Sequence, residues 1–197
     1  ADKLNIPTSF VFANGGIIVA QAPDFLFLKD TNGDDKADVR ETIMTGWGVF
    51  DTHAGPSNFK YGPDNSIWAT VGYSGYKGVV GANADTTRFA QALYKFSADG
   101  KQMEHLGTTS NNTWGLGFSE DFDVFISTAN NTHNAAFTIP KRYFDMAGEY
   151  NETGIEKTES HYAMHVVTKN LRQVDVHGGF TSAAGHNLYT ARNYPKD

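Results

Sequence analysis

The residues with the clearest chemical meaning form an acidic segment at positions 30–41. Oxygen-bearing side chains stand at the first, third, fifth, ninth and twelfth positions of this segment. A loop with that spacing can wrap about six to eight oxygen ligands around one Ca²⁺ ion. The pattern therefore predicts a calcium loop. The expected ligands are the side chains of Asp30, Asn32, Asp34, Asp38 and Glu41 and the backbone carbonyl of Lys36.

Two features distinguish this segment from a helical calcium-binding hand. Its sixth position, where glycine is usual, holds Asp35, and aspartate tolerates a left-handed backbone better than most residues. The preceding residues 25–28 read as a β-strand and not as an entering helix. We therefore expect a loop between strands in which Ca²⁺ has a structural role. The alternative is a solvated acidic turn.

One of the seven histidines, His53, stands where a ligand site is expected. It lies in a polar loop, residues 51–58, directly before an aromatic strand segment at 59–61. Ligand sites commonly collect in loops at one end of a β-scaffold. No HExxH or comparable spacing occurs, so the histidines do not predict a zinc enzyme. Other candidates for the same face are His177, His186 and Trp114, with turn-stabilising or core roles as the alternatives.

The overall composition excludes several classes of function. A net charge of −6 with interspersed signs provides no basic stripe for nucleic acid. The absence of cysteine excludes disulfides, thiolate zinc sites, thiol nucleophiles and covalent haem attachment within these 197 residues. No run of about 18 apolar residues is present, so no membrane span is expected.

Short strands must position the candidate residues, because a hairpin pattern returns along the chain. In the first copy, the turn at Asn14-Gly15 supplies the positive φ values that a tight hairpin needs. The copies are separated by 49, 57 and 64 residues and begin at Phe10, Phe59, Leu116 and Phe180. A propeller blade takes about 40–50 residues. The repeat predicts an all-β fold, a β-propeller over residues 1–197 with four blades, each with the second strand of the pair innermost. A β-sandwich is the alternative.

Two regions lack this pattern. Residues 72–87 contain glycine at 72, 75, 78 and 81, and we expect a flexible loop between strands. Residues 139–162 are polar and include Pro140 followed by a basic and aromatic segment, for which we expect a short helix and an excursion.

Longer motifs resemble the soluble quinoprotein glucose and sorbosone dehydrogenase family. His53 followed by residues 59–72 (FKYGPDNSIWATVG) is similar to a family segment in which a histidine is the general base. Residues 111–118 (NNTWGLGF) resemble the family motif RNPxGLxF, with Asn112 at the motif's asparagine. Asn111 stands where the family has an arginine that contacts quinone and substrate.

A stronger resemblance is to the "membrane-bound dehydrogenase" type propellers of planctomycetes and Bacteroidetes. It covers almost the whole chain and is carried by residues 27–53 and 172–192. It implies a six-bladed ring of which this chain is a part, and a periplasmic or extracellular bacterial location. It also implies oxidation of a sugar or polyol by pyrroloquinoline quinone (PQQ), with a c-type cytochrome as possible electron acceptor.

The resemblance implies roles for the candidate residues. His53 would be the general base, and the cofactor-binding residues would be Asn112, Trp114, His177 and His186. Two alternatives stay open at this stage. One is a non-catalytic, calcium-stabilised propeller that binds partners, which Asn111 in place of arginine favours. The other is a propeller hydrolase such as a lactonase, although no clear Glu, Asn and Asp set for its central calcium stands out.

Overall fold

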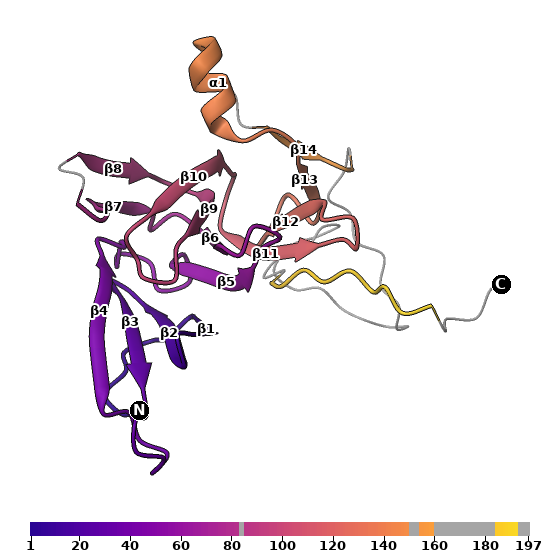
Figure 1. Ribbon diagram of the computed structural model, residues 1–197. Coiled ribbons are helices and arrows are strands. Elements are labelled where there is room, and N and C mark those ends of the chain that lie inside the picture. The colour runs from indigo at the N-terminus through magenta and orange to yellow at the C-terminus, as the bar shows by residue number, and fades with distance from the viewer. Residues whose placement is uncertain (83–84, 150–153, 160–183, 193–197) are drawn as a thin grey trace.

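The computed structural model describes residues 1–82, 85–149, 154–159 and 184–192. This part of the chain is mostly β-structure, as the sequence predicts. It contains four antiparallel sheets, three of four strands and one of two, together with one short helix (Figure 1). None of the helices in the described part is long and apolar enough to cross a membrane.

The first sheet is an up-and-down arrangement of four consecutive strands. The turn between the first two strands is the predicted one, with φ of 52° at Asn14 and 72° at Gly15. Phe10 lies opposite Val19 in the resulting hairpin. The strands are β1 (Ser9–Ala13), β2 (Gly16–Gln21), β3 (Asp24–Lys29) and β4 (Val39–Thr45).

The second sheet repeats this arrangement with an insertion. Its strands are β5 (Pro56–Tyr61), β6 (Ile67–Val71), β9 (Ala92–Phe96) and β10 (Met103–Thr108). Between β6 and β9, strands β7 (Tyr76–Val79) and β8 (Thr86–Phe89) form a two-stranded ribbon.

The expectation of a flexible loop over residues 72–87 is therefore wrong. Tyr76 and Phe89 lie opposite each other in the ribbon and are buried beside Trp47. The glycines allow close strand approach: a Cβ at Gly75 would come within 2.6 Å of the Phe89 carbonyl oxygen. Burial of the aromatic pair therefore outweighs the flexibility that glycine confers.

The third sheet has the same order again. It consists of β11 (Thr113–Phe118), β12 (Val124–Thr128), β13 (Ala135–Phe137) and β14 (Ile155–Lys157). The predicted short helix is present as α1 (Lys141–Ala147), between β13 and β14. The fourth predicted hairpin begins at Phe180, outside the described residues, and the described residues 184–192 form no strand.

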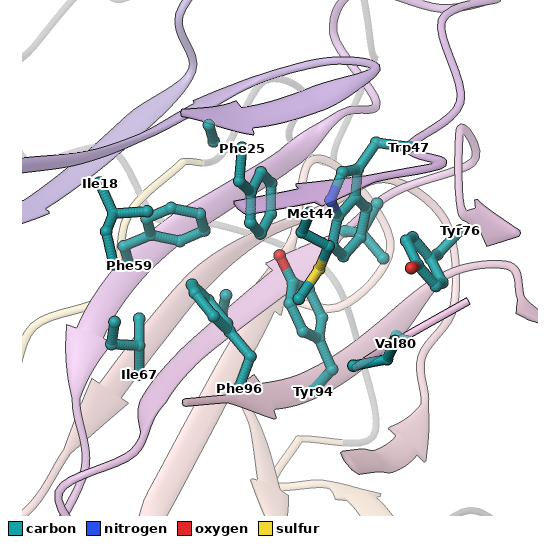
Figure 2. Packing of buried hydrophobic residues seen from close by; sticks show 14 of the residues in the cluster. Ile18, Phe25, Met44, Trp47, Phe59, Ile67, Tyr76, Val80, Tyr94 and Phe96 are labelled. Carbon is teal, nitrogen blue, oxygen red and sulfur yellow. The ribbon is translucent and has the colours of Figure 1, made fainter. Parts of the chain in front are cut away.

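An aromatic core joins the first two sheets. The Phe25 and Trp47 rings stack with centroids 4.6 Å apart, and Phe59 meets Phe25 edge to face at 4.9 Å (Figure 2). Trp47, only 2% exposed, also contacts Tyr76 and Tyr94. Each fully buried large apolar side chain contributes about 1.5–3 kcal/mol to folding. This cluster therefore holds the insertion ribbon as well as the two sheets.

A second core joins the second and third sheets, where Trp68 meets Phe118 edge to face at 5.7 Å. The first strands of the three sheets lie at sheet edges, and β5 contacts both β1 and β11 (Figure 1). The expectation that the second strand of each pair is innermost is therefore wrong. The second strand of each pair lies inside its sheet and is paired on both sides, which leaves the first strand at the edge.

Candidate functional site

Four loops meet at one end of the sheets, and we call this surface the loop face (residues 49–55, 72–75, 109–114 and 129–131). Hydrogen bonds connect these loops to one another. The Ser74 hydroxyl donates to the carbonyl of Asp51 at 2.8 Å, and the Tyr73 backbone N–H donates to the Asn112 side-chain oxygen at 3.3 Å. The backbone N–H of Ala129 donates to the Asn112 carbonyl at 2.6 Å. The candidate residues of three distant sequence segments therefore share one surface.

His53 presents an exposed imidazole on the loop face. Its side chain is 90% exposed, and its Nδ1 lies 3.9 Å from Oδ1 of Asp51. The same carboxylate oxygen accepts the His53 backbone N–H at 2.9 Å, which fixes the turn. The Trp114 indole N–H donates to the His53 carbonyl. The backbone of His53 is thus held at two points while its ring remains accessible, an arrangement suited to proton transfer with a ligand.

Asn112 contributes a hydrogen-bond donor to the loop face. Because its side-chain oxygen accepts the Tyr73 N–H, its NH₂ group is the part left to bind a ligand. Close packing defines this position, since a Cβ at Gly72 would lie 2.8 Å from the Asn112 oxygen. The structure thus brings Asn112, Trp114 and His53 to the same surface.

Asn111 has a structural role. Its NH₂ donates to the Asn130 carbonyl at 3.1 Å, and its oxygen accepts the Tyr73 hydroxyl at 3.1 Å. Its φ of 49° is left-handed, a conformation that asparagine tolerates. It therefore links two loops and offers no positive charge where the resembling family has an arginine.

His186 is placed differently from the other candidates. Its ring is parallel to that of Phe125, with centroids 6.1 Å apart, on the surface of the third sheet. Its carbonyl accepts the Lys60 ammonium at 3.1 Å. Burial, and secondarily the charge of Lys60, lowers the pKa of the imidazole. Through these contacts the 184–192 segment packs against β11 and β12. His177 lies outside the described residues.

The predicted calcium loop connects β3 to β4 and is built from short polar turns. One oxygen of Asp30 accepts the N–H groups of Asn32 and Gly33 at 3.1 and 2.7 Å, and the other accepts that of Asp35 at 2.8 Å. Asp35 has a φ of 64°, the left-handed conformation expected from its sequence position. The N–H of Gly33, followed by those of Asp35 and Asn32, lowers the pKa of Asp30.

Asp38 closes the loop from its other end. One carboxylate oxygen accepts both the backbone N–H and the hydroxyl of Thr31 at 2.8 Å, and the other accepts the Asn32 amide at 3.3 Å. Hydrogen bonds from Thr31 lower the pKa of Asp38, and the charge of Asp30 opposes this shift. The carboxylates of Asp30 and Asp38 therefore lie close enough to repel each other, and both accept hydrogen bonds from Asn32.

The remaining predicted ligands contribute unequally. Asp34 accepts the Lys36 N–H at 2.9 Å and so belongs to the same series of turns. Glu41 lies in β4 opposite Phe27, beyond the loop itself. Among the described residues, no group of three or more His, Asp or Glu side chains is gathered as a metal site. A cation here would depend on the carboxylates of Asp30, Asp34 and Asp38 together with amide and backbone oxygens, which are ligands that Ca²⁺ accepts.

Sequence reasoning missed two contributors to the loop face. Asp51 stands two residues before His53, and this spacing was the available signal for a turn that supports the histidine. Tyr73 had no signal because its partners Asn111 and Asn112 are 38 and 39 residues away.

Comparison with known proteins gives a family without a described activity. No curated protein and no solved structure matches the chain. A family model described as a domain of unknown function, DUF7133, matches residues 1–197. Since this match spans the whole sequence, the chain belongs to the DUF7133 family.

Proposed function

We propose that the chain is part of a β-propeller whose loop face binds a sugar or polyol for oxidation with PQQ. Three consecutive up-and-down sheets of four strands support the propeller, as does the contact of β5 with both β1 and β11. Such sheets around an axis place the loops of one end together, where propellers commonly bind ligands. The resemblance of the sequence to quinone-dependent dehydrogenases supplies the reaction class.

The observation that carries the functional proposal is the exposed imidazole of His53 beside Asp51. An imidazole in its neutral form can accept a hydroxyl proton as the alcohol carbon becomes a carbonyl. The Asp51 carboxylate would stabilise the imidazolium that forms. The Asn112 NH₂ group can donate to a ligand oxygen, and the Trp114 ring offers an aromatic surface.

The quinone would be held by Asn112 and Trp114, and when bound it supplies the two-electron acceptor. The residues of this chain orient the ligand and remove the proton. A periplasmic or extracellular location and a c-type cytochrome as the next electron acceptor follow from the same resemblance and belong to the proposal.

Calcium in this proposal is structural. The loop of residues 30–38 and the loop face lie at opposite ends of β4, which has seven residues. A strand of that length separates its ends by about 20 Å. A Ca²⁺ ion held by Asp30, Asn32, Asp34 and Asp38, with the Lys36 carbonyl and Glu41, would therefore stabilise the β3–β4 connection and not touch a ligand at His53.

A non-catalytic binding module is the second candidate. It is favoured by Asn111, whose side chain is fully engaged between Tyr73 and Asn130 and carries no charge. Such a module would retain the fold and the calcium loop but would not bind the quinone.

Calorimetric titration with PQQ, followed by dye reduction on a sugar and polyol panel, separates the two candidates. The dehydrogenase should bind PQQ, and His53→Ala should lower the rate by about 10²–10⁴-fold, the usual contribution of a general base. The melting temperature should be unchanged, because the His53 side chain is 90% exposed. A folded, calcium-loaded protein that binds no quinone would contradict the dehydrogenase and leave the binding module.

A further inference from the structure

A hollow beside the loop face has a composition that the proposed oxidation does not use. It has a volume of about 520 Å³ and is lined in part by residues of the β7–β8 ribbon. Its floor comes from three neighbouring backbone segments that place small residues on the same side, namely Gly48, Gly75 and Ala90. The large side chains between them, Trp47, Tyr76 and Phe89, belong to the buried core.

Two cations line one side of this hollow. Lys77 and Arg88 are directly opposite each other in the β7–β8 pairing, so both side chains project from the same face of the ribbon. Like charges in this position destabilise an antiparallel pair. Neither side chain forms an ion pair or a hydrogen bond with any residue in the part of the chain that the structure describes. The two positive charges are therefore available to an anion from outside.

Two exposed aromatic side chains line the hollow as well. Phe50 is 74% exposed and Tyr73 is 42% exposed. Exposed rings of this kind provide flat apolar surfaces for the face of a sugar ring. Tyr73 also binds Asn111 and Asn112, and Ser74 binds Asp51, so the hollow adjoins the loop face.

We propose that this hollow is a binding site for an acidic saccharide, one whose ring carries a carboxylate or a sulfate ester. The anionic group would bind to Lys77 and Arg88, whose guanidinium can donate two parallel hydrogen bonds to a carboxylate or sulfate. The ring would lie against Phe50 and Tyr73 over the small-residue floor. The bond between sugar and protein is entirely non-covalent, and the site requires neither the quinone nor His53.

A matched set of ligands tests the assignment on the whole chain at low salt. The probes are glucuronate, glucose 6-sulfate, glucose and inorganic sulfate, added without PQQ and followed by calorimetry and by amide NMR. Glucuronate and glucose 6-sulfate should bind at least about tenfold more tightly than glucose, since charged hydrogen bonds of this kind are worth about that factor or more. The perturbed amides should include those of Ser74, Lys77 and Arg88. Affinity should fall with ionic strength.

Variants separate the cationic and aromatic contributions. Lys77→Gln with Arg88→Gln should weaken the two acidic sugars by at least about tenfold, whereas the matched control Lys157→Gln on β14 should leave them unchanged. Phe50→Ala should weaken glucose 6-sulfate but not inorganic sulfate. Because Lys77, Arg88 and Phe50 are exposed, none of these variants should melt at a lower temperature than the wild type. Removing the like charges of Lys77 and Arg88 should if anything stabilise the β7–β8 pair.

Four outcomes would overturn the proposal. Three are binding of inorganic sulfate as tight as that of glucose 6-sulfate, no preference for the acidic sugars over glucose, and unchanged affinity in the doubly substituted variant. The fourth is competition by PQQ. The test is independent of the proposed oxidation. His53→Ala should retain acidic-sugar binding, and failure to bind PQQ would leave this site standing. If PQQ, itself a carboxylate, displaces glucuronate and its own binding is lost in the doubly substituted variant, the hollow is a quinone site and the saccharide assignment is wrong.

Discussion

The two ends of β4 satisfy their polar groups in opposite ways. At the β3–β4 connection, both oxygens of Asp30 and both oxygens of Asp38 accept hydrogen bonds from the loop itself. At the loop face, His53 has its backbone secured while its side chain is left to solvent. A polar loop with its own hydrogen bonds keeps its shape without help, whereas an exposed imidazole on a secured backbone is available for a ligand. The difference distinguishes a structural loop from a candidate site.

The two ends of β4 also differ in what stabilises them. A substitution in the aromatic core tests this difference. Trp47 follows β4 at the loop-face end and is almost fully buried among Phe25, Tyr76 and Tyr94. Trp47→Ala should lower the free energy of unfolding by about 3–5 kcal/mol, the usual cost of deleting a buried large aromatic side chain. Denaturant unfolding followed by circular dichroism measures the loss.

The loops should respond unequally to that substitution. Amide NMR signals of residues 72–78 should shift strongly, because the Trp47 ring packs against the Tyr76 ring. Those of residues 31–36 should change little, since their hydrogen bonds are local. Equal disturbance at both ends would show that the calcium loop also depends on this core. A Phe10→Ala variant, which removes an exposed ring, is the control for the loss of an aromatic side chain.

Calcium gives the next largest effect and acts only at the β3–β4 connection. If the loop binds Ca²⁺, a concentration 100-fold above the dissociation constant should stabilise the protein by about 2.7 kcal/mol. Asp30→Asn with Asp34→Asn should abolish the difference in melting temperature between calcium and chelator, since the substituted amides keep acceptor oxygens but lose the charges that bind the ion. The exposed turn residue Asp121 provides the matched control, as Asp121→Asn should keep the full difference. An unchanged calcium-dependent rise in the paired variant would remove the metal from this loop.

Lowering the pH should have the smallest effect, and this effect should be confined to the β3–β4 loop. The pKa values of Asp30 and Asp38 are lowered mainly by backbone N–H groups, so their hydrogen bonds stabilise the loop above the ordinary pKa of 3.8. This stabilisation is lost as the pH falls below 3.8 through the lowered values of the folded state. Amide exchange at Gly33 and Thr31, measured in chelator from pH 5 downward, should lose protection only in that range. Loss of protection near neutral pH would mean that other groups hold the loop.

The parts of the structure that depend on local pattern were predictable from sequence, whereas those that depend on distant contacts were not. The Asn14-Gly15 turn, the strand before residue 30 and the helix after Pro140 follow from turn chemistry and short-range periodicity, and the structure contains all three. The β7–β8 ribbon was mistaken for a loop because its glycines read as flexibility until the burial of Tyr76 and Phe89 is known.

The candidate site shows the same limit. His53 could be selected from its position before a strand, and Asp51 lies within its own turn. The bond from the Trp114 indole to the His53 carbonyl joins residues 61 positions apart, and only the packing of the second and third sheets creates it. The pairing of Lys77 with Arg88 likewise depends on a strand register that the intervening glycines conceal.

The indole bond from Trp114 has a consequence for the entropy of ligand binding. It holds the carbonyl of His53, while the side chain of the histidine is 90% exposed. An exposed ring of this kind samples its rotamers in picoseconds to nanoseconds. Fixing it on a ligand would cost about 0.5–1.5 kcal/mol, the ordering of a single side chain, with no further cost for closing the loop. The His53 side chain can therefore change rotamer rapidly to meet a proton donor while its backbone stays in place.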